Sequence, residues 1–399
     1  MISVKQADQI ISENIREFPI VEISLEKAVG AILQEDLKAD RDLPPFNKSL
    51  MDGIAVKWAA WKSGVREFKI TAIQAAGTPP VTIKRDNECA EIMTGAVLTR
   101  GADCVIPVEC LTIKQNSAYL NDDVKLQPML NIRPKGADHK KGVVLVEKGC
   151  ILTPAKVATA AAIGKSKVKV SYQPRVAIIS TGDEIVDIDA DIKPYQVRKS
   201  NSYFIKSALD NTRLFNSSAF HFKDDRKILL RQIAAILDEF DVLVLTGGVS
   251  MGKFDYIPGV MEELGVKLLF HKVKQKPGRP FWFGKSKKHQ PVFALPGNPV
   301  STQVGIMRYV IPSLKTSLNL KNIPEEYAVL SRDYQPDTLL TFFLTVQLTY
   351  NKKGTLEAYP VATGGSGDFA GTAVCDGFME LPANLGLIKA GFSGKVYRW

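Results

Sequence analysis

The most informative stretch of this sequence covers residues 241–256 and reads Asp241-Val-Leu-Val-Leu-Thr-Gly-Gly-Val-Ser-Met-Gly-Lys-Phe-Asp-Tyr256. An apolar run rich in branched residues gives way to glycines and a hydroxyl, and residues 257–264 have the composition of a short helix. This pattern predicts a buried parallel strand that leads into a helix through a loop able to bind an anion. Ligands of open α/β sheets bind beyond the carboxyl ends of the strands, so Thr246 to Asp255 should line a site. The spacing fits neither a dinucleotide fingerprint nor a P-loop, so glycines that merely turn the chain are an equal alternative.

Two other segments repeat this strand-and-loop pattern. Residues 175–180 and 291–295 are apolar runs, followed by Thr181-Gly-Asp-Glu184 and Pro296-Gly-Asn-Pro299. Such alternation predicts a doubly wound parallel sheet whose loops gather at one ligand-binding edge. The helices predicted between its strands cover residues 201–210 and 226–239.

The flanking regions show other patterns. Apolar spacing predicts an amphipathic helix over residues 3–17, and composition suggests a second helix over 25–35. Short alternating runs between turn residues predict a β-rich module from residue 68 to 126. An alanine-rich helix is expected from Pro154 to about Gly164, and a small β-barrel or sandwich after residue 320.

We therefore expect an α/β multidomain chain with a central doubly wound parallel-sheet domain. Its predicted parts are a helical linking subdomain (1–43 with 139–172), a β-rich subdomain (44–138), an α/β catalytic domain (173–319) and a C-terminal β-barrel (320–399).

Composition narrows the classes of partner. The 399 residues carry a net charge of +10, which favours an anionic partner. The basic residues are spread thinly, however, so no nucleic acid is expected. No apolar run approaches the ~20 residues of a membrane helix, and the first residues lack a signal-peptide pattern. We expect no membrane association and a cytoplasmic location.

Cysteine and histidine usage argues against soft metal sites. The five cysteines are odd in number, and none are spaced as Cys-x-x-Cys, so they are interpreted as reduced packing residues. With only four scattered histidines, a transition-metal site is not expected either.

Acidic residues in loops are the first candidates for chemistry. Carboxylates in loops usually cap turns or face solvent. Gathered at one edge, they would suit Mg²⁺, which binds a few carboxylates, waters and phosphate oxygens. These candidates are Asp52, Asp138, Glu184, Asp224 and Asp255.

A basic, proline-rich turn at residues 271–281 is the second candidate. If this segment is extended, Lys272, Lys274 and Lys276 share one face and could hold an oxyanion. The alternative is an exposed strand edge protected by lysines.

Together these segments resemble the MoeA family, the molybdopterin molybdenumtransferases. The matching motifs occur in order along the chain. They are Pro44-Pro-Phe46 to Ser49 with Met51-Asp-Gly53, Ile92-Met-Thr-Gly-Ala96 with Gly101-Ala-Asp103, Ser180-Thr-Gly-Asp-Glu184, Ser200-Asn-Ser202, Thr246 to Tyr256, Lys276-Pro-Gly-Arg-Pro280 and Leu295 to Ser301.

The resemblance implies an elongated homodimer whose active cleft joins the α/β domain of one protomer to the β-rich module of the other. It implies a reaction of adenylylated molybdopterin with molybdate, in which metal is inserted and AMP is released with Mg²⁺ as the cofactor. An upstream adenylyltransferase and downstream cofactor carriers are possible further partners.

The resemblance also assigns roles to residues. It implies catalytic roles for Asp52, Thr94, Asp138, Glu184, Asp224 and Asp255, with Mg²⁺ held by Asp52, Glu184 and Asp255. The expected substrate and molybdate contacts are Lys272, Lys274, Lys276, Arg279, Gly247, Gly248, Ser250, Pro296, Asn298, Pro299, Ser301 and, more weakly, Ser366. We expect an alanine at Gly247 or Gly248 to weaken binding more than folding.

The chain departs from the family at Asn47, Ile54 and Thr345, where aspartate, tyrosine and arginine are usual. Alternative functions are a molybdopterin adenylyltransferase-type activity, tungstate handling, and a scaffold role. The adenylyltransferase type would not need the Pro-Pro-Phe and Met-Asp-Gly module, which makes it less favoured.

Overall fold

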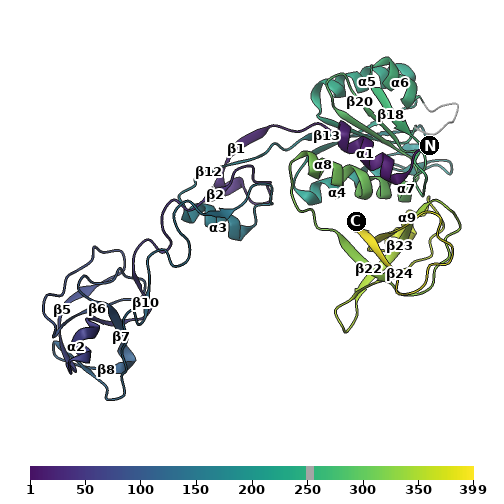
Figure 1. Cartoon of the computed structure of the whole chain (residues 1–399). Coiled ribbons are helices and arrows are strands. Elements are labelled where there is room, and N and C mark those ends of the chain that lie inside the picture. The colour runs from purple at the N-terminus through teal and green to yellow at the C-terminus, as the bar shows by residue number, and fades with distance from the viewer. Residues whose placement is uncertain (249–255) are drawn as a thin grey trace. The chain divides into compact units, whose positions relative to one another are not determined.

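The computed structural model describes residues 1–248 and 256–399, which form two compact units (Figure 1). The larger unit comprises residues 1–35, 148–154 and 167–399, and the smaller comprises 36–147 and 155–166. The division into four subdomains stays a prediction.

A six-stranded sheet forms the centre of the larger unit. Its order is β16 (Asn216–Phe222), β13 (Arg175–Thr181), β17 (Val242–Thr246), β21 (Pro291–Leu295), β20 (Trp282–Lys285) and β18 (Lys267–His271). The first four strands are parallel, which confirms the three predicted strands. The last two are antiparallel, so the sheet is mixed. Sequence patterns missed β16, β18 and β20 because none of these strands ends in a glycine-rich loop.

Helices cover both faces of this sheet because alternate strand residues point to opposite faces. Val242 and Val244 pack in one core, whereas Leu243 and Leu245 pack in the other. The first core is covered by α1 (Val4–Asn14), α4 (Asn201–Thr212), η3 (Ile306–Val310) and α8 (Ile311–Ser317). The helix α7 (Pro299–Gly305) leads directly into η3, and its Val304 packs against Phe343 and Phe378 of the barrel. The second is covered by α5 (Arg226–Glu239) and α6 (Ile257–Glu263). The doubly wound arrangement is thereby confirmed.

The predicted helix over residues 25–35 is wrong. Only a short 3₁₀ turn forms, η1 (Leu25–Lys27), and Gly30 has a φ of +87°. Beyond the turn, Ile32 and Leu33 form β-bridges with Ile151 and Val170. Pairing with distant segments therefore overrides the local helical composition of this segment.

The C-terminal residues form a closed five-stranded β-barrel, as predicted. Its strands follow the order β23 (Thr341–Tyr350), β24 (Leu356–Pro360), β22 (Glu326–Leu330), β26 (Ser393–Arg398) and β25 (Gly377–Leu381), and β25 pairs again with β23. The short strand β19 (Gln275–Lys276) adds to β23 in parallel. This pairing ties the basic turn of the α/β region to the barrel.

The smaller unit is β-rich, as expected. Its six-stranded sheet has the order β7 (Cys104–Pro107), β4 (Gly53–Val56), β6 (Glu88–Ile92), β5 (Glu67–Gln74), β9 (Ser117–Leu120) and β8 (Leu111–Lys114). Most of the alanine-rich helix α3 (Pro154–Ala162) belongs to this unit.

The remaining elements are short. They are β1 (Ile20–Ser24), β2 (Leu37–Lys38), β3 (Lys48–Ser49), α2 (Trp58–Lys62), η2 (Val108–Cys110), β10 (Ile132–Arg133), β11 (Val144–Val146), β12 (Lys167–Ser171), β14 (Ile185–Val186), β15 (Val197–Arg198) and α9 (Phe369–Thr372). None of the helices in the described chain has the length and apolar character needed to cross a membrane. All five cysteines are free thiols, and burial raises the pKa of Cys89 and of Cys104 to about 12.

Candidate functional site

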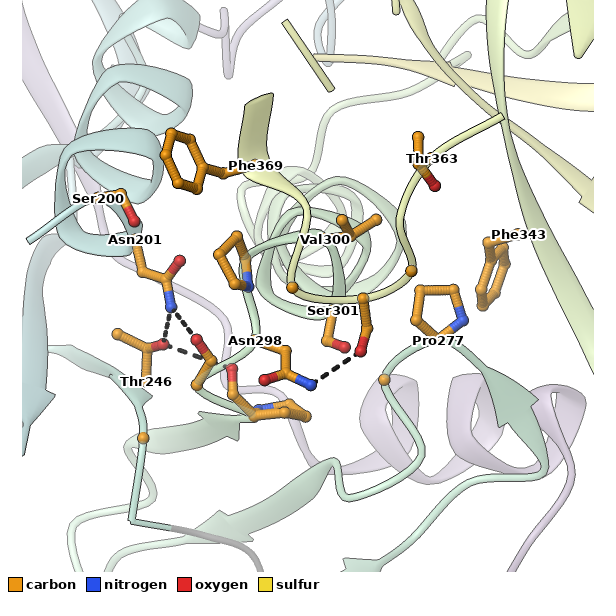
Figure 2. Close-up of a pocket in the computed structure, with 18 of the residues that line it drawn as sticks. Ser200, Asn201, Thr246, Pro277, Asn298, Val300, Ser301, Phe343, Thr363 and Phe369 are labelled. Atoms are coloured by element: carbon orange, nitrogen blue, oxygen red, sulfur yellow. Dashed lines mark hydrogen bonds between the residues drawn. The ribbon is translucent and has the colours of Figure 1, made fainter. Parts of the chain in front are cut away.

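A cavity of about 1490 Å³ lies in the larger unit, where the parallel strands end. Register pairs Ser180 with Thr246 and Thr246 with Leu295, so the carboxyl ends of β13, β17 and β21 are aligned. The loops after these strands form one side of the cavity, and barrel residues such as Phe343 and Thr363 line it as well (Figure 2). A cavity is therefore present at the sheet edge where the sequence predicted ligand binding.

Many of the candidate residues line this cavity although they are distant in sequence. The candidates among its lining residues are Glu184, Asp224, Gly247, Gly248, Lys276, Arg279, Pro296, Asn298, Pro299, Ser301 and Ser366. Their roles in binding or catalysis stay predictions.

Lys272 and Lys274 do not line the cavity. Lys272 has a φ of +72°, and its backbone N–H donates to the carbonyl of Phe281 at 3.0 Å. The segment 272–276 is therefore not one continuous extended strand, and the predicted common face of three lysines is wrong. Ser250 and Asp255 lie outside the described residues.

Asp52, Thr94 and Asp138 belong to the smaller unit. The structure brings two of them together, because the backbone N–H of Thr94 donates to the Asp52 carboxylate at 2.7 Å. Asp138 instead forms an ion pair with Arg133.

The residues at two of the positions noted above are placed in this unit. Ile54 is fully buried in the sheet core, where an apolar side chain packs without a hydrogen-bond partner. The Asn47 side-chain oxygen accepts a hydrogen bond of 2.8 Å from the Lys135 backbone N–H, a contact that an aspartate would make as well.

A hydrogen-bond network joins the loops of the cavity wall (Figure 2). The Asn201 side-chain amide donates to the Thr246 hydroxyl at 2.9 Å and to the Gly297 carbonyl at 2.7 Å. The Thr302 hydroxyl donates to the Pro296 carbonyl at 2.7 Å and lies 3.2 Å from the Thr246 hydroxyl. This network holds the loops after β17 and β21 in register with the start of α4.

A second set of contacts connects the α/β region to the barrel. The Asn298 amide donates to the Ser366 hydroxyl at 2.8 Å, and the Val300 backbone N–H donates to the Ser366 carbonyl at 3.0 Å. Ser366 therefore has a positional role in the site, which its glycine-rich surroundings could not reveal.

The glycines after β17 are required by close packing. Gly247 has a φ of +92°, and a Cβ there would lie 2.8 Å from the Thr181 carbonyl oxygen. Gly248 has a φ of +66°, and a Cβ there would lie 2.9 Å from the Thr181 hydroxyl and from Ile257. Alanine at either position is therefore strained in the fold itself. This revises the expectation that binding would suffer more than folding.

Basic side chains reach the cavity from several elements. Lys276 forms an ion pair with Asp337, and Lys199 with Asp187. The Arg332 guanidinium donates to the Pro360 carbonyl at 2.8 Å. Within the described part of the chain, the exposed Arg279 side chain has no ion-pair or hydrogen-bond partner. No described residue therefore competes with an anionic ligand for the Arg279 side chain.

Two carboxylates at the cavity could contribute to binding of Mg²⁺. Across residues 1–248 and 256–399, no three His, Cys, Asp or Glu side chains gather so that they could hold a metal ion. Mg²⁺ nevertheless often uses only one or two protein carboxylates, with waters and phosphate oxygens completing its shell. Glu184 is exposed at the cavity, and Asp224 also lines its wall. The Glu184 carboxylate lies so close to Gly182 that a Cβ added there would be 2.7 Å from it. These residues fit that sparse mode of binding.

A titratable group that the sequence did not single out, His221, interacts electrostatically with Glu184. The Nδ1 atom of His221 is 3.0 Å from the Ser180 hydroxyl. Burial lowers the pKa of His221, with a smaller contribution from the positive charge of Lys199. The imidazole is therefore held in its neutral form to lower pH than a free histidine.

Several lining residues were not among the candidates. Asn201 and Thr246 lie in motifs that carried the resemblance, so a signal for them was present. Arg332 and Asp337 come from the segment before β23, where no motif was recognised.

Comparisons with known proteins cover nearly the whole chain. Residues 2–164 match the MoeA N-terminal region (domain I and II), residues 177–316 match a probable molybdopterin binding domain, and residues 327–399 match the MoeA C-terminal region (domain IV). The chain is 36% identical over 400 residues to a molybdopterin molybdenumtransferase of Synechocystis sp., covering 100% of both proteins. It is 30% identical over 403 residues to one of Staphylococcus epidermidis, covering 98% of this chain and 94% of that protein. Its structure is similar to that of the molybdopterin biosynthesis MoeA protein from Pyrococcus horikosii, with a TM-score of 0.85, 29% identity and coverage of 100% of this chain and 99% of that one.

Proposed function

Because the chain belongs to the MoeA family of molybdopterin molybdenumtransferases, enzymes of molybdenum cofactor biosynthesis, we propose that its cavity binds adenylylated molybdopterin and molybdate. The observation that carries this proposal is the cavity at the aligned ends of β13, β17 and β21. A pterin nucleotide is large and anionic, and a cavity of about 1490 Å³ with basic residues on several walls suits such a ligand.

Oxyanion binding is assigned to the loop that carries Lys276 and Arg279. Molybdate is a dianion and the pterin nucleotide carries phosphates, so both require cationic groups or N–H donors. Arg279 can offer a planar fork of donors to two oxygens at once, and Lys276 a point charge. Asn298 and Ser301 add polar contacts from the loop that leads into α7.

AMP release is proposed to be a hydrolysis of the pyrophosphate link. Water adds to one phosphorus atom, the bridging oxygen leaves with the other phosphate, and the released protons pass to solvent or a nearby base. Among the described carboxylates that line the cavity, Glu184 is proposed to orient this water. Mg²⁺, when bound, would neutralise charge on the phosphate oxygens, and Glu184 would be among its ligands. The family resemblance implies Asp52 and Asp255 as further Mg²⁺ ligands.

Further roles rest on the family resemblance. Asp52, Thr94, Asp138 and Asp224 are proposed as additional catalytic residues, and the enzyme is proposed to act as a homodimer. Tungstate has the same charge and nearly the same size as molybdate, so the site is expected to accept it as well.

The test measures molybdate-dependent AMP release from adenylylated molybdopterin. Glu184→Gln and Asp52→Asn keep side-chain size while removing a charge, so each is expected to abolish release without unfolding the protein. The matched control is Asp238→Asn, because Asp238 is exposed, pairs with Lys288 and does not line the cavity. Unchanged rates in both active-site variants would contradict the proposal.

A further inference from the structure

Lys276 and Asp337 form an ion pair within the cavity. The Lys276 ammonium belongs to the basic loop of the α/β region, whereas the Asp337 carboxylate comes from the barrel segment that precedes β23. The side chains remain 47% and 67% exposed, so both partners stay accessible to a ligand. The lysine assigned above to oxyanion binding is thus neutralised by a carboxylate of the same chain.

The backbone of Lys276 is held in place. Gln275 and Lys276 pair with Thr341 and Phe342 of β23, which fixes the loop against the barrel. The buried Gln275 amide donates at 3.2 Å to the carbonyls of Pro277 and Gly278. The place of the Lys276 backbone therefore follows from strand pairing and not from free movement of a surface loop.

Arg279 and Asp333 lie near the Lys276–Asp337 pair in sequence but, among the described residues, neither is paired with the other's loop, so they can serve as controls. Arg279 lines the cavity from the same loop but has no ion-pair partner among the described residues. Asp333 lies in the same barrel segment as Asp337 but pairs with Lys389 at 2.8 Å and does not line the cavity. Asp337 is thus set against one of the two basic residues that the 276–280 loop brings to the cavity.

We propose that Asp337 is an internal competitor for Lys276, which the substrate oxyanion must displace and which lowers the oxyanion affinity of the cavity. This inference rests on the proposed function, because it takes Lys276 as an oxyanion-binding residue. Carboxylate oxygens accept hydrogen bonds from an ammonium group in the same way as oxyanion oxygens, so the two acceptors compete for one donor. After turnover the carboxylate returns to Lys276 and favours release of the anionic product.

The strength of the pair suits a reversible competitor. Exposed ion pairs contribute at most about a fivefold factor to an equilibrium constant, because water screens them and the side chains lose rotamer freedom. A dianion can therefore displace Asp337, at a modest loss of affinity. A buried pair would instead resist displacement.

The experiment measures the dissociation constant of molybdate by isothermal titration calorimetry at low ionic strength. Asp337→Asn keeps the shape of the side chain and removes its charge. We expect this variant to bind molybdate about two- to fivefold more tightly than the unsubstituted protein, and the gain to shrink as salt is added. Asp333→Asn is the matched control and should leave the dissociation constant unchanged.

Two double variants separate competition for Lys276 from a general change in charge. In a Lys276→Gln background the gain from Asp337→Asn should be clearly smaller, because the shared partner is absent. In an Arg279→Gln background the gain should persist in full. An equal gain in all three backgrounds would overturn the inference in favour of long-range repulsion alone.

The remaining outcomes distinguish this inference from the proposed function. If Lys276→Gln weakens molybdate binding but Asp337→Asn leaves it unchanged or weaker, the oxyanion site stands and the competitor role of Asp337 is overturned. If the unsubstituted protein binds no molybdate, or Lys276→Gln has no effect, the proposed oxyanion site fails and the inference fails with it. Urea unfolding of each variant checks that the exposed substitutions leave the fold intact.

Discussion

The Asn201 side-chain amide donates a hydrogen bond of 2.9 Å to the Thr246 hydroxyl, which joins the first turn of α4 to the end of the central strand β17. The same amide nitrogen donates to the Gly297 carbonyl in the loop after β21. One side chain thus connects three segments of the cavity wall. Removing this side chain should therefore change the geometry of the site more than removing a lining side chain that contacts only solvent.

We expect Asn201→Ala to lower turnover and to cost about 1–3 kcal/mol of unfolding free energy, because two hydrogen bonds are lost. Asn201→Asp has the same size but lacks the N–H donor and adds a negative charge beside an anion site. It should therefore weaken molybdate binding more than the alanine variant does. Molybdate titration and urea unfolding of both variants measure this. Asn351→Ala, in a barrel hairpin, is the control that should lose stability but keep turnover. Equal binding by the two Asn201 variants would contradict the prediction.

The second prediction separates two costs at Gly247. Gly247→Ala combines a left-handed φ of +92° with a contact of 2.8 Å between the new Cβ and the Thr181 carbonyl oxygen. The control is Gly354→Ala, because Gly354 has a φ of +77° but no atom within 4 Å of a new Cβ. Gly354→Ala should cost about 1–2 kcal/mol from the backbone conformation alone, and Gly247→Ala clearly more. Similar losses of unfolding free energy in both would show that the loop after β17 can shift to admit a methyl group.

The third prediction concerns the pH dependence of stability at His221. Its pKa in the folded protein is lowered from the ordinary value of 6.5, mainly by burial. As pH falls below about 6.5, the unfolded chain takes up a proton at this position before the folded protein does, so the unfolded state is favoured. The stability that neutral His221 provides is thus fully present above pH 6.5 and is lost as pH falls through the lowered folded pKa.

His221→Gln removes the titration while keeping a polar side chain near the Ser180 hydroxyl. The unfolding free energy of the unsubstituted protein should drop between about pH 7.5 and about pH 5.5, and that of the variant should drop less. The readout is urea unfolding at both pH values. The same drop in the two proteins would rule out this histidine as a source of the pH dependence.

Secondary structure was predicted correctly where the spacing of apolar residues within one segment was clear. The buried run before Thr246 forms β17, and the apolar stripe of residues 226–239 forms α5. Residues 25–35 show the opposite case, because their helical composition yields to bridges with residues 151 and 170. The antiparallel strands β18 and β20 were also missed, since β20 is placed by pairing with β21, and β18 at the sheet edge by pairing with β20.

Sequence alone was sufficient to find the family resemblance, which the comparisons confirm. It also identified the strands whose loops form the cavity edge, because apolar runs and glycine-containing loops are local signals. The tertiary structure decided which basic residues reach the cavity. Lys272 leaves the extended conformation, Lys276 is held by β19 against β23, and Asp337 reaches it from the barrel. The physical reason is that the charge at a site depends on which side chains meet in space. Pairing between strands far apart in the sequence determines that meeting, and periodicity within one segment carries no record of it.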